Sequence, residues 1–152
     1  MEFQVEEVED FMVVGIAVRV DMSNAADLIG GLWQRWFREG IAAKIRNKSS
    51  TDTYNIYTNY EGDHTKPYTC FLGCRVDSLD RIPDRMQAID IKGGKYAVFD
   101  VAGKIPDAVM ETWMKIYQMD DLERTFTADF DVYGEGAANP ENAKLQTFVA
   151  IK

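Results

Sequence analysis

An internal repeat constrains the fold of this 152-residue chain more than any other feature of its sequence. Residues 33–37 (WQRWF) and 113–117 (WMKIY) share a Trp, a basic residue two positions later, and then an apolar and an aromatic residue, at an offset of eighty positions. Three further pairs keep the same order along the chain, with equal or slightly shorter offsets: 17–18 with 97–98, 54–57 with 130–133, and 71–72 with 148–149. The repeat predicts a single domain of two fused halves, about 1–80 and 81–152.

Each half is expected to contain a strand, a helix and two further strands. In the first half, an apolar β-branched run predicts a strand at 11–20, and apolar residues spaced three and four apart predict a helix from 25 to about 43. Segments rich in Tyr and Thr predict strands at 53–60 and 68–76, which a polar turn joins into a hairpin.

The second half repeats this order after an additional strand candidate at 86–91. Further strands are predicted at 95–102, 130–133 and 145–151, and a helix over about 106–119 has Pro106 in its first turn. Two such halves can join their strands into one mostly antiparallel sheet with two helices on one face. The sequence therefore predicts an α+β fold of duplicated β-α-β-β halves with pseudo-twofold symmetry, and a pocket in the crease between the helices.

The charge balance excludes one class of partner. The chain has 17 Lys and Arg against 25 Asp and Glu, a net charge of −8 and a pI near 4.6, and a surface of that sign repels nucleic-acid phosphates. The longest apolar run is far shorter than a membrane span, and acidic residues directly after Met1 are not typical of a signal peptide. We expect a cytoplasmic protein that binds neither nucleic acid nor membranes, and the oligomeric state stays open.

Few residues offer metal or nucleophile chemistry. Cys70 and Cys74 lie four apart in a predicted strand, which indicates two reduced, buried thiols rather than a disulfide. His64 is the only histidine and lies in a polar turn. The sequence therefore predicts no metal, no cofactor and no Ser-His-Asp or Cys-His catalytic set.

Several short segments together carry a family resemblance. They are residues 93–99 (GGKYAVF), the W-x-x-I-Y pattern of 113–117, and the strands 130–133 (FDVY) and 148–151 (FVAI). In their joint order they resemble the GyrI-like small-molecule-binding family, the effector-binding domain of AraC- and MerR-type transcription activators. In the first half, L-W-x-x-W at 32–36 and the turn over 57–63 resemble the stand-alone branch of that family.

The chain departs from the family pattern in three places. Asp131 replaces the usual Glu, residues 119–124 (MDDLER) replace an L-P-x-S-G turn, and no helix-turn-helix is predicted before the first strand. The resemblance therefore implies a free-standing small-molecule-binding module rather than a complete transcription factor.

The resemblance further implies a ligand that is lipophilic and often cationic. Aromatic faces attract a cation, and a partly buried carboxylate neutralises it. Period two in the strands puts Asn55 and Tyr57 on one face with Glu61 continuing it, and Asp131 and Tyr133 on the equivalent face of the repeat. The helices add a set of aromatic candidates: Trp33, Trp36, Phe37, Trp113 and Tyr117.

Each candidate also has a purely structural interpretation. Aromatic residues at helical spacing form cores, Glu61 fits a solvated turn, and Asp131 fits a sheet edge. Three functions stay open: binding or sensing of lipophilic small molecules of drug-like kind, cationic ones among them; a protein-interaction module like the gyrase inhibitors of the family; and hydrolysis of reactive cyclopropane-containing natural products, an activity ascribed to some relatives.

Overall fold

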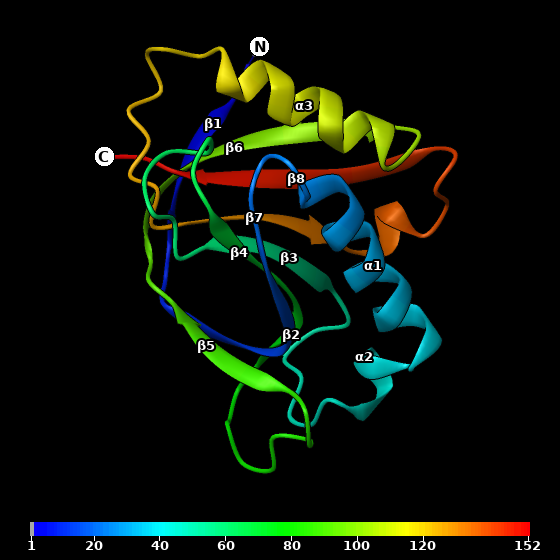
Figure 1. Ribbon diagram of the computed structural model, residues 1–152. Coiled ribbons are helices and arrows are strands. Elements are labelled where there is room, and N and C mark those ends of the chain that lie inside the picture. Colours follow the sequence, from blue (N-terminus) through cyan, green and yellow to red (C-terminus); the bar gives the residue numbers. More distant parts are fainter. Residues whose placement is uncertain (1) are drawn as a thin grey trace.

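A curved β-sheet organises the molecule, and both long helices pack on one of its faces (Figure 1). The computed structural model describes residues 2–152, and within them the sheet has eight strands. The strands are β1 (Gln4–Val8), β2 (Phe11–Val20), β3 (Thr53–Thr58), β4 (Tyr68–Val76), β5 (Gln87–Ile91), β6 (Gly94–Gly103), β7 (Ala128–Tyr133) and β8 (Ala143–Ala150). The helices are α1 (Ala25–Arg38), α2 (Ile41–Lys44), α3 (Asp107–Tyr117) and the short 3-10 helix η1 (Glu135–Ala137).

The strand order displays the duplication directly. Neighbouring strands follow the order β1-β6-β8-β7-β3-β4-β2-β5, and every pairing is antiparallel. Exchanging β1–β4 with β5–β8 returns the same order reversed, so a pseudo-twofold axis passes between β3 and β7. The first strand of each half pairs with the other half, β1 with β6 and β5 with β2. The predicted α+β fold with duplicated halves in one antiparallel sheet is confirmed.

Two apolar clusters fix the helices to the sheet. Leu32 and Trp36 of α1 pack in one cluster with β2 and β4, while Val109, Trp113 and Ile116 of α3 pack in another with β6 and β8. The three-and-four spacing of these residues gives each helix one apolar face, and each buried side chain contributes about 2 kcal/mol. A third cluster, rich in aromatic residues, lies on the opposite face of the sheet.

The main differences from the sequence prediction concern β1, the first helix and β7. The sequence does not predict β1, because its residues are mostly charged or polar and almost all exposed. The helix predicted to about residue 43 ends at Arg38, since Gly40 adopts a left-handed conformation (φ 58°) before α2 begins. β7 begins at Ala128, two residues before its predicted start, and therefore includes Asp129.

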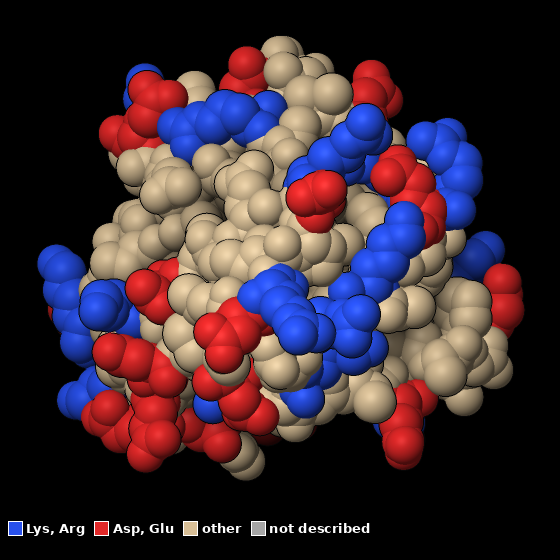
Figure 2. Space-filling view, turned by 90° about the horizontal axis from the view of Figure 1, so that it is seen from below, with Lys and Arg blue, Asp and Glu red and all other residues tan. Residues whose placement is uncertain are grey.

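Charge is unevenly distributed over the surface. Figure 2 shows the underside of Figure 1, where β5 and α2 lie, and there basic side chains gather near the middle of the face while acidic ones gather at one side. The net charge of −8 therefore does not form a uniformly acidic surface. Among the described residues, no helix combines the length and apolar character needed to cross a bilayer.

We expect a side chain at Gly15 to disrupt the sheet, because β2 and β4 approach closely where Gly15 pairs with Gly73. A Cβ atom at Gly15 would lie 1.8 Å from the carbonyl oxygen of Leu72. Gly15→Ala should therefore lower the free energy of unfolding, measured by urea denaturation, by about 3 kcal/mol.

Gly30→Ala in α1 is the matched control. Apart from its chain neighbours and the backbone of its own helix, no described atom lies within 4 Å of the position that a Cβ would take at Gly30. Removing a glycine from a helix should raise the free energy of unfolding by up to about 1 kcal/mol. Equal stabilities of the Gly15→Ala variant and the unchanged chain would contradict the close packing of β2 on β4.

Candidate functional site

The centre of the helical face holds a buried carboxylate, that of Asp131 in β7. Alternation along β7 turns Asp131 toward the helices, and its side chain is fully buried. The carboxylate accepts hydrogen bonds from the Tyr57 hydroxyl of β3 at 2.7 Å, the Thr147 hydroxyl of β8 at 2.6 Å and the Trp113 indole N–H of α3 at 3.1 Å. Elements of both halves thus converge on one acidic group.

Burial makes this carboxylate hard to ionise. Loss of contact with water raises the pKa of Asp131 to about 6, although its three hydrogen bonds favour the ionised form. The neighbouring carboxylate of Asp129 raises the pKa further. Within residues 2–152, the ion pairs involve other acids, and none includes Asp131. Asp131 is therefore a buried acid without a cationic partner in the described part of the chain.

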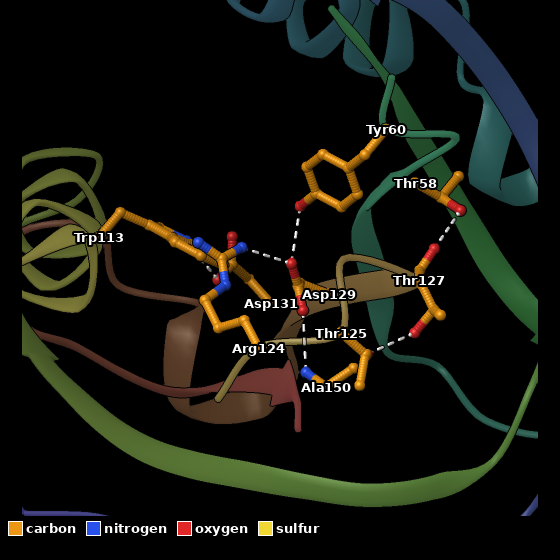
Figure 3. Close-up of polar contacts among 9 residues, drawn as sticks. All are labelled: Thr58, Tyr60, Trp113, Arg124, Thr125, Thr127, Asp129, Asp131 and Ala150. Carbon is orange, nitrogen blue, oxygen red and sulfur yellow. Dashed lines mark hydrogen bonds and ion pairs between the residues drawn. The ribbon is translucent and has the colours of Figure 1, made fainter. Parts of the chain in front are cut away.

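A second buried carboxylate, Asp129, lies two residues earlier on the same face of β7. It forms an ion pair with Arg124 at 2.7 Å, and it accepts hydrogen bonds from the Tyr60 hydroxyl at 2.7 Å and the Ala150 backbone N–H at 2.8 Å (Figure 3). Burial raises the pKa of Asp129, while the Arg124 guanidinium opposes that shift. Two buried acids and one buried cation therefore lie side by side.

The pseudo-twofold axis also arranges the aromatic residues. Trp113 of α3 meets Tyr57 of β3 edge-on, with ring centres 5.2 Å apart, and Trp33 of α1 meets Tyr133 of β7 edge-on at 4.9 Å. Each helix Trp therefore packs on a Tyr that the other half supplies. These two contacts join α1 and α3 to β7 and β3, the two strands that adjoin at the axis.

One pair of residues breaks this symmetry. Asn55 of β3 and Asp131 of β7 hold equivalent positions in the repeat, and they pair with each other across the axis. The Asn55 amide donates to the Tyr57 hydroxyl at 3.1 Å, and its oxygen accepts a hydrogen bond from the Cys70 thiol at 3.0 Å. A neutral amide thus stands where strict symmetry would place a second carboxylate.

Six of the ten predicted site residues form the hydrogen bonds and edge-on ring contacts described above. They are Asn55, Tyr57, Asp131, Tyr133, Trp33 and Trp113. The sheet pairing and the repeat explain why side chains distant in sequence meet here, because β3 and β7 adjoin at the axis.

The other four predicted site residues make other contacts. Trp36 is buried in the core beneath α1, whereas Phe37 is 72% exposed near the end of that helix, where its ring stacks on Trp33. Tyr117 stacks on His64 with ring centres 3.9 Å apart and also contacts the Trp113 ring. Glu61 forms an exposed ion pair with Arg19 at 2.8 Å. Ligand roles for these four residues stay predictions.

Four polar residues of this region are absent from the sequence prediction: Thr147, Asp129, Tyr60 and Arg124. Asp129 lies two residues before Asp131, so both side chains project from the same face of β7. A strand predicted from residue 128 would therefore include Asp129 in the site. Arg124 lies in the loop between α3 and β7, where no periodic pattern indicates the direction of a side chain. Only the tertiary fold brings it to Asp129.

Other features of the described residues do not form a comparable site. They contain no group of three or more His, Cys, Asp or Glu positioned to hold a metal ion. An open groove of about 380 Å³ lies on the opposite face of the sheet, against Phe11, Tyr54, Phe130 and Phe148. On the helical face, a ligand could reach Asp131 only if one of the covering rings moved.

Substitution of Asp131 should change how stability depends on pH. The pKa of this group is 3.8 in an ordinary environment and about 6 in the folded chain, so the folded state binds the proton more tightly. As pH rises from about 4 to about 6, the unchanged chain should therefore lose up to about 3 kcal/mol of stability through this group. Asp131→Asn lacks the titration, so its free energy of unfolding relative to the unchanged chain should rise across that interval.

Urea denaturation at pH values from about 4 to about 8 measures this difference. Asp120→Asn, at an exposed position, controls for the removal of one negative charge. If Asp131→Asn and the unchanged chain differ by the same free energy at every pH, the pKa of Asp131 is not raised.

Comparison with known proteins places this geometry in a family context. The family model for Cass2, the integron-associated effector binding protein, matches residues 4–151. YobU of Bacillus subtilis (strain 168), a candidate transcriptional regulator protein, is 33% identical over 138 residues, which cover 86% of each chain.

Solved structures share the fold. The integron cassette protein VCH_CASS2 from the mobile metagenome of Vibrio cholerae superposes with a TM-score of 0.78 at 23% identity, over 99% of this chain and 95% of that one. SAV2435, solved with bound tetraphenylphosphonium, gives a TM-score of 0.85 at 21% identity, over 100% of this chain and 94% of that one. The resemblance to GyrI-like effector-binding domains is thereby confirmed, and the chain belongs to the Cass2 family of integron-associated effector binding proteins.

Proposed function

We propose that this protein binds lipophilic cations in the crease between α1 and α3, with Asp131 as the counter-ion. One observation carries the proposal: Asp131 is fully buried, lies beneath aromatic rings, and forms none of the ion pairs within residues 2–152. An ionised buried carboxylate without a cationic partner destabilises the folded chain, and either a proton or a bound cation removes that destabilisation.

The surrounding rings suit an organic cation better than a hydrated metal ion. The Trp113 indole and the Tyr57 hydroxyl both donate to the carboxylate, and Trp33 and Tyr133 form the second aromatic pair. A cation over such faces gains about 0.5–2 kcal/mol per ring once water is excluded. A neutral ligand would leave the ionised carboxylate without compensation, so the same group supplies selectivity.

Binding requires the covering side chains to move. Asp131 has no exposed surface, and the Tyr57 hydroxyl and Trp113 indole both bond to it. A ligand must therefore displace at least one of these rings, and displacement of Trp113 changes the environment of an indole. Tryptophan fluorescence is a direct readout of binding at this site.

The relatives support this proposal. The SAV2435 structure holds tetraphenylphosphonium, a lipophilic monocation, on the same fold. The family is described as effector-binding, and YobU is a candidate regulator. We therefore assign to this chain the sensing or sequestering of lipophilic cations, and the net charge of −8 favours their approach.

Asp131→Asn should weaken the binding of tetraphenylphosphonium by about 10- to 100-fold, because the amide cannot neutralise the cation. Triphenylphosphine oxide, a neutral compound with similar rings, should bind the variant at least as tightly as the unchanged chain, because the variant has no uncompensated carboxylate. Titrations followed by tryptophan fluorescence and by calorimetry measure both affinities. An equal loss for the charged and the neutral compound would contradict charge pairing by Asp131.

Glu61→Gln is the matched control for loss of a predicted acid. Glu61 pairs with Arg19 on an exposed part of the hairpin, so its amide variant should change the affinity for tetraphenylphosphonium less than about threefold. A loss as large as that in Asp131→Asn would make Glu61 the counter-ion instead.

A second candidate function is hydrolysis of an electrophilic ligand at the same site. Asp131 has a pKa of about 6 and shares a hydrogen bond with the Tyr57 hydroxyl, and an acid with a pKa near neutrality suits general acid–base catalysis. Incubation with a strained-ring electrophile separates the two functions. Product that forms with the unchanged chain and disappears in Asp131→Asn indicates hydrolysis, while saturable binding without product indicates a binding module.

A further inference from the structure

The site contains positions for two positive charges, and the chain itself occupies one of them. Asp129 and Asp131 project from the same face of β7, roughly 6–7 Å apart along the strand. Both carboxylates are fully buried. Arg124 is ion-paired with Asp129, whereas Asp131 takes part in none of the ion pairs within residues 2–152.

The Arg124 guanidinium makes the kinds of contact that an organic cation makes in a binding site, with aromatic rings and with a carboxylate. Its guanidinium lies over the Phe126 ring at 4.3 Å and faces the Trp113 ring at 5.6 Å, and it meets the Asp129 carboxylate at 2.7 Å. The side chain is only 7% exposed. Aromatic faces with a carboxylate at their base are the chemistry that the proposed ligand would meet at Asp131.

The guanidinium is incompletely bonded, which is unusual for a buried Arg. Arg124 Nε is buried and has no hydrogen-bond partner among the described residues. Among the described residues, the polar and cation–π contacts of the Arg124 side chain are therefore one ion pair and two ring faces. The contacts of Arg124 at this position therefore depend on its positive charge rather than on a full set of hydrogen bonds.

The backbone fixes Arg124 in place. The loop residue Arg124 forms an isolated bridge with Ile151, and Thr125 N–H donates to the Ala150 carbonyl at 3.1 Å. Glu123 and Phe126, on either side, adopt left-handed conformations (φ 49° and 55°) that aim the loop toward the end of β8. The loop backbone therefore has a defined conformation, and it holds the Arg124 side chain beside Asp129.

Trp113 links the two charge positions. Its ring faces the Arg124 guanidinium, while its indole N–H donates to Asp131 at 3.1 Å (Figure 3). A ligand cation paired with Asp131 would therefore share this indole with Arg124. A second ligand charge near Asp129 would meet the guanidinium in a region of low dielectric, where like charges repel strongly.

We propose that Arg124 is a built-in cation that neutralises Asp129 and thereby restricts the site to ligands with a single positive charge. The inference rests on the proposed function and adds the rule by which the site discriminates among cations. Replacing Arg124 by a neutral side chain of similar length would open a second charge position beside Asp131 and favour dications.

Two matched probes test the rule. 1-Methyl-4-phenylpyridinium carries one charge on a biaryl frame, and methyl viologen carries two charges on nearly the same frame. The unchanged chain should bind the monocation at least about tenfold more tightly than the dication at pH about 8. Arg124→Met should reduce that preference at least about tenfold, and the double variant Arg124→Met, Asp129→Asn should restore it, since it again holds one carboxylate in excess.

Asp129→Asn keeps the test decisive if Arg124→Met does not fold. In Asp129→Asn, Arg124 loses its ion-pair partner, and the nearest remaining buried carboxylate is Asp131. Because the guanidinium then competes with the ligand for Asp131, the affinity for the monocation should fall at least about tenfold. Thermal denaturation of every variant checks that the chain remains folded. Unchanged monocation affinity in folded Asp129→Asn, or an unchanged preference in folded Arg124→Met, would overturn the role of Arg124.

Failure of the proposed function gives a different result. In that case the unchanged chain binds neither 1-methyl-4-phenylpyridinium nor tetraphenylphosphonium, and the inference falls with it. If the unchanged chain binds both monocations but the variants retain its preference, only the role of Arg124 is wrong.

Discussion

Burial of a carboxylate at the axis between the two halves is the constraint that shapes the rest of the site. Asp131 occupies the middle of the sheet, where an apolar side chain would pack without cost, and burial opposes its ionisation. The donors that surround it come from β3, β8 and α3. Because one acid requires donors from three elements, it joins the halves through hydrogen bonds as well as through the continuous sheet.

The duplication accounts for the two Trp–Tyr contacts, which form an aromatic frame around the axis, and one asymmetric residue pair accounts for the charge of the site. The two equivalent Trp–Tyr contacts, Trp113 with Tyr57 and Trp33 with Tyr133, follow from the repeat alone. A strictly symmetric molecule would carry either two acids or two amides at the axis. The pairing of Asn55 with Asp131 instead leaves one carboxylate, so a symmetric frame encloses a site with a single charge and a defined direction.

The sequence predicts what periodic patterns determine and misses what tertiary contacts determine. The sheet, both long helices and the shared face of Tyr57 and Asp131 follow from periodicity and from the repeat. The same periodicity places Trp33 and Trp36 on one helix stripe, although only Trp33 packs on Tyr133 and Trp36 enters the core. The ion pair of Arg124 with Asp129 leaves no periodic trace, because it joins a loop to a strand through the fold.

The same free energy connects stability with selectivity at this site. A raised pKa at Asp131 means that ionisation at neutral pH destabilises the folded chain by up to about 3 kcal/mol. A cation placed against the carboxylate removes this penalty, whereas a neutral ligand of the same shape does not. The displacement of Tyr57 or Trp113 that binding requires is therefore offset only for charged ligands. Arg124 already reduces the equivalent penalty at Asp129, so most of the free energy available to a ligand corresponds to one positive charge.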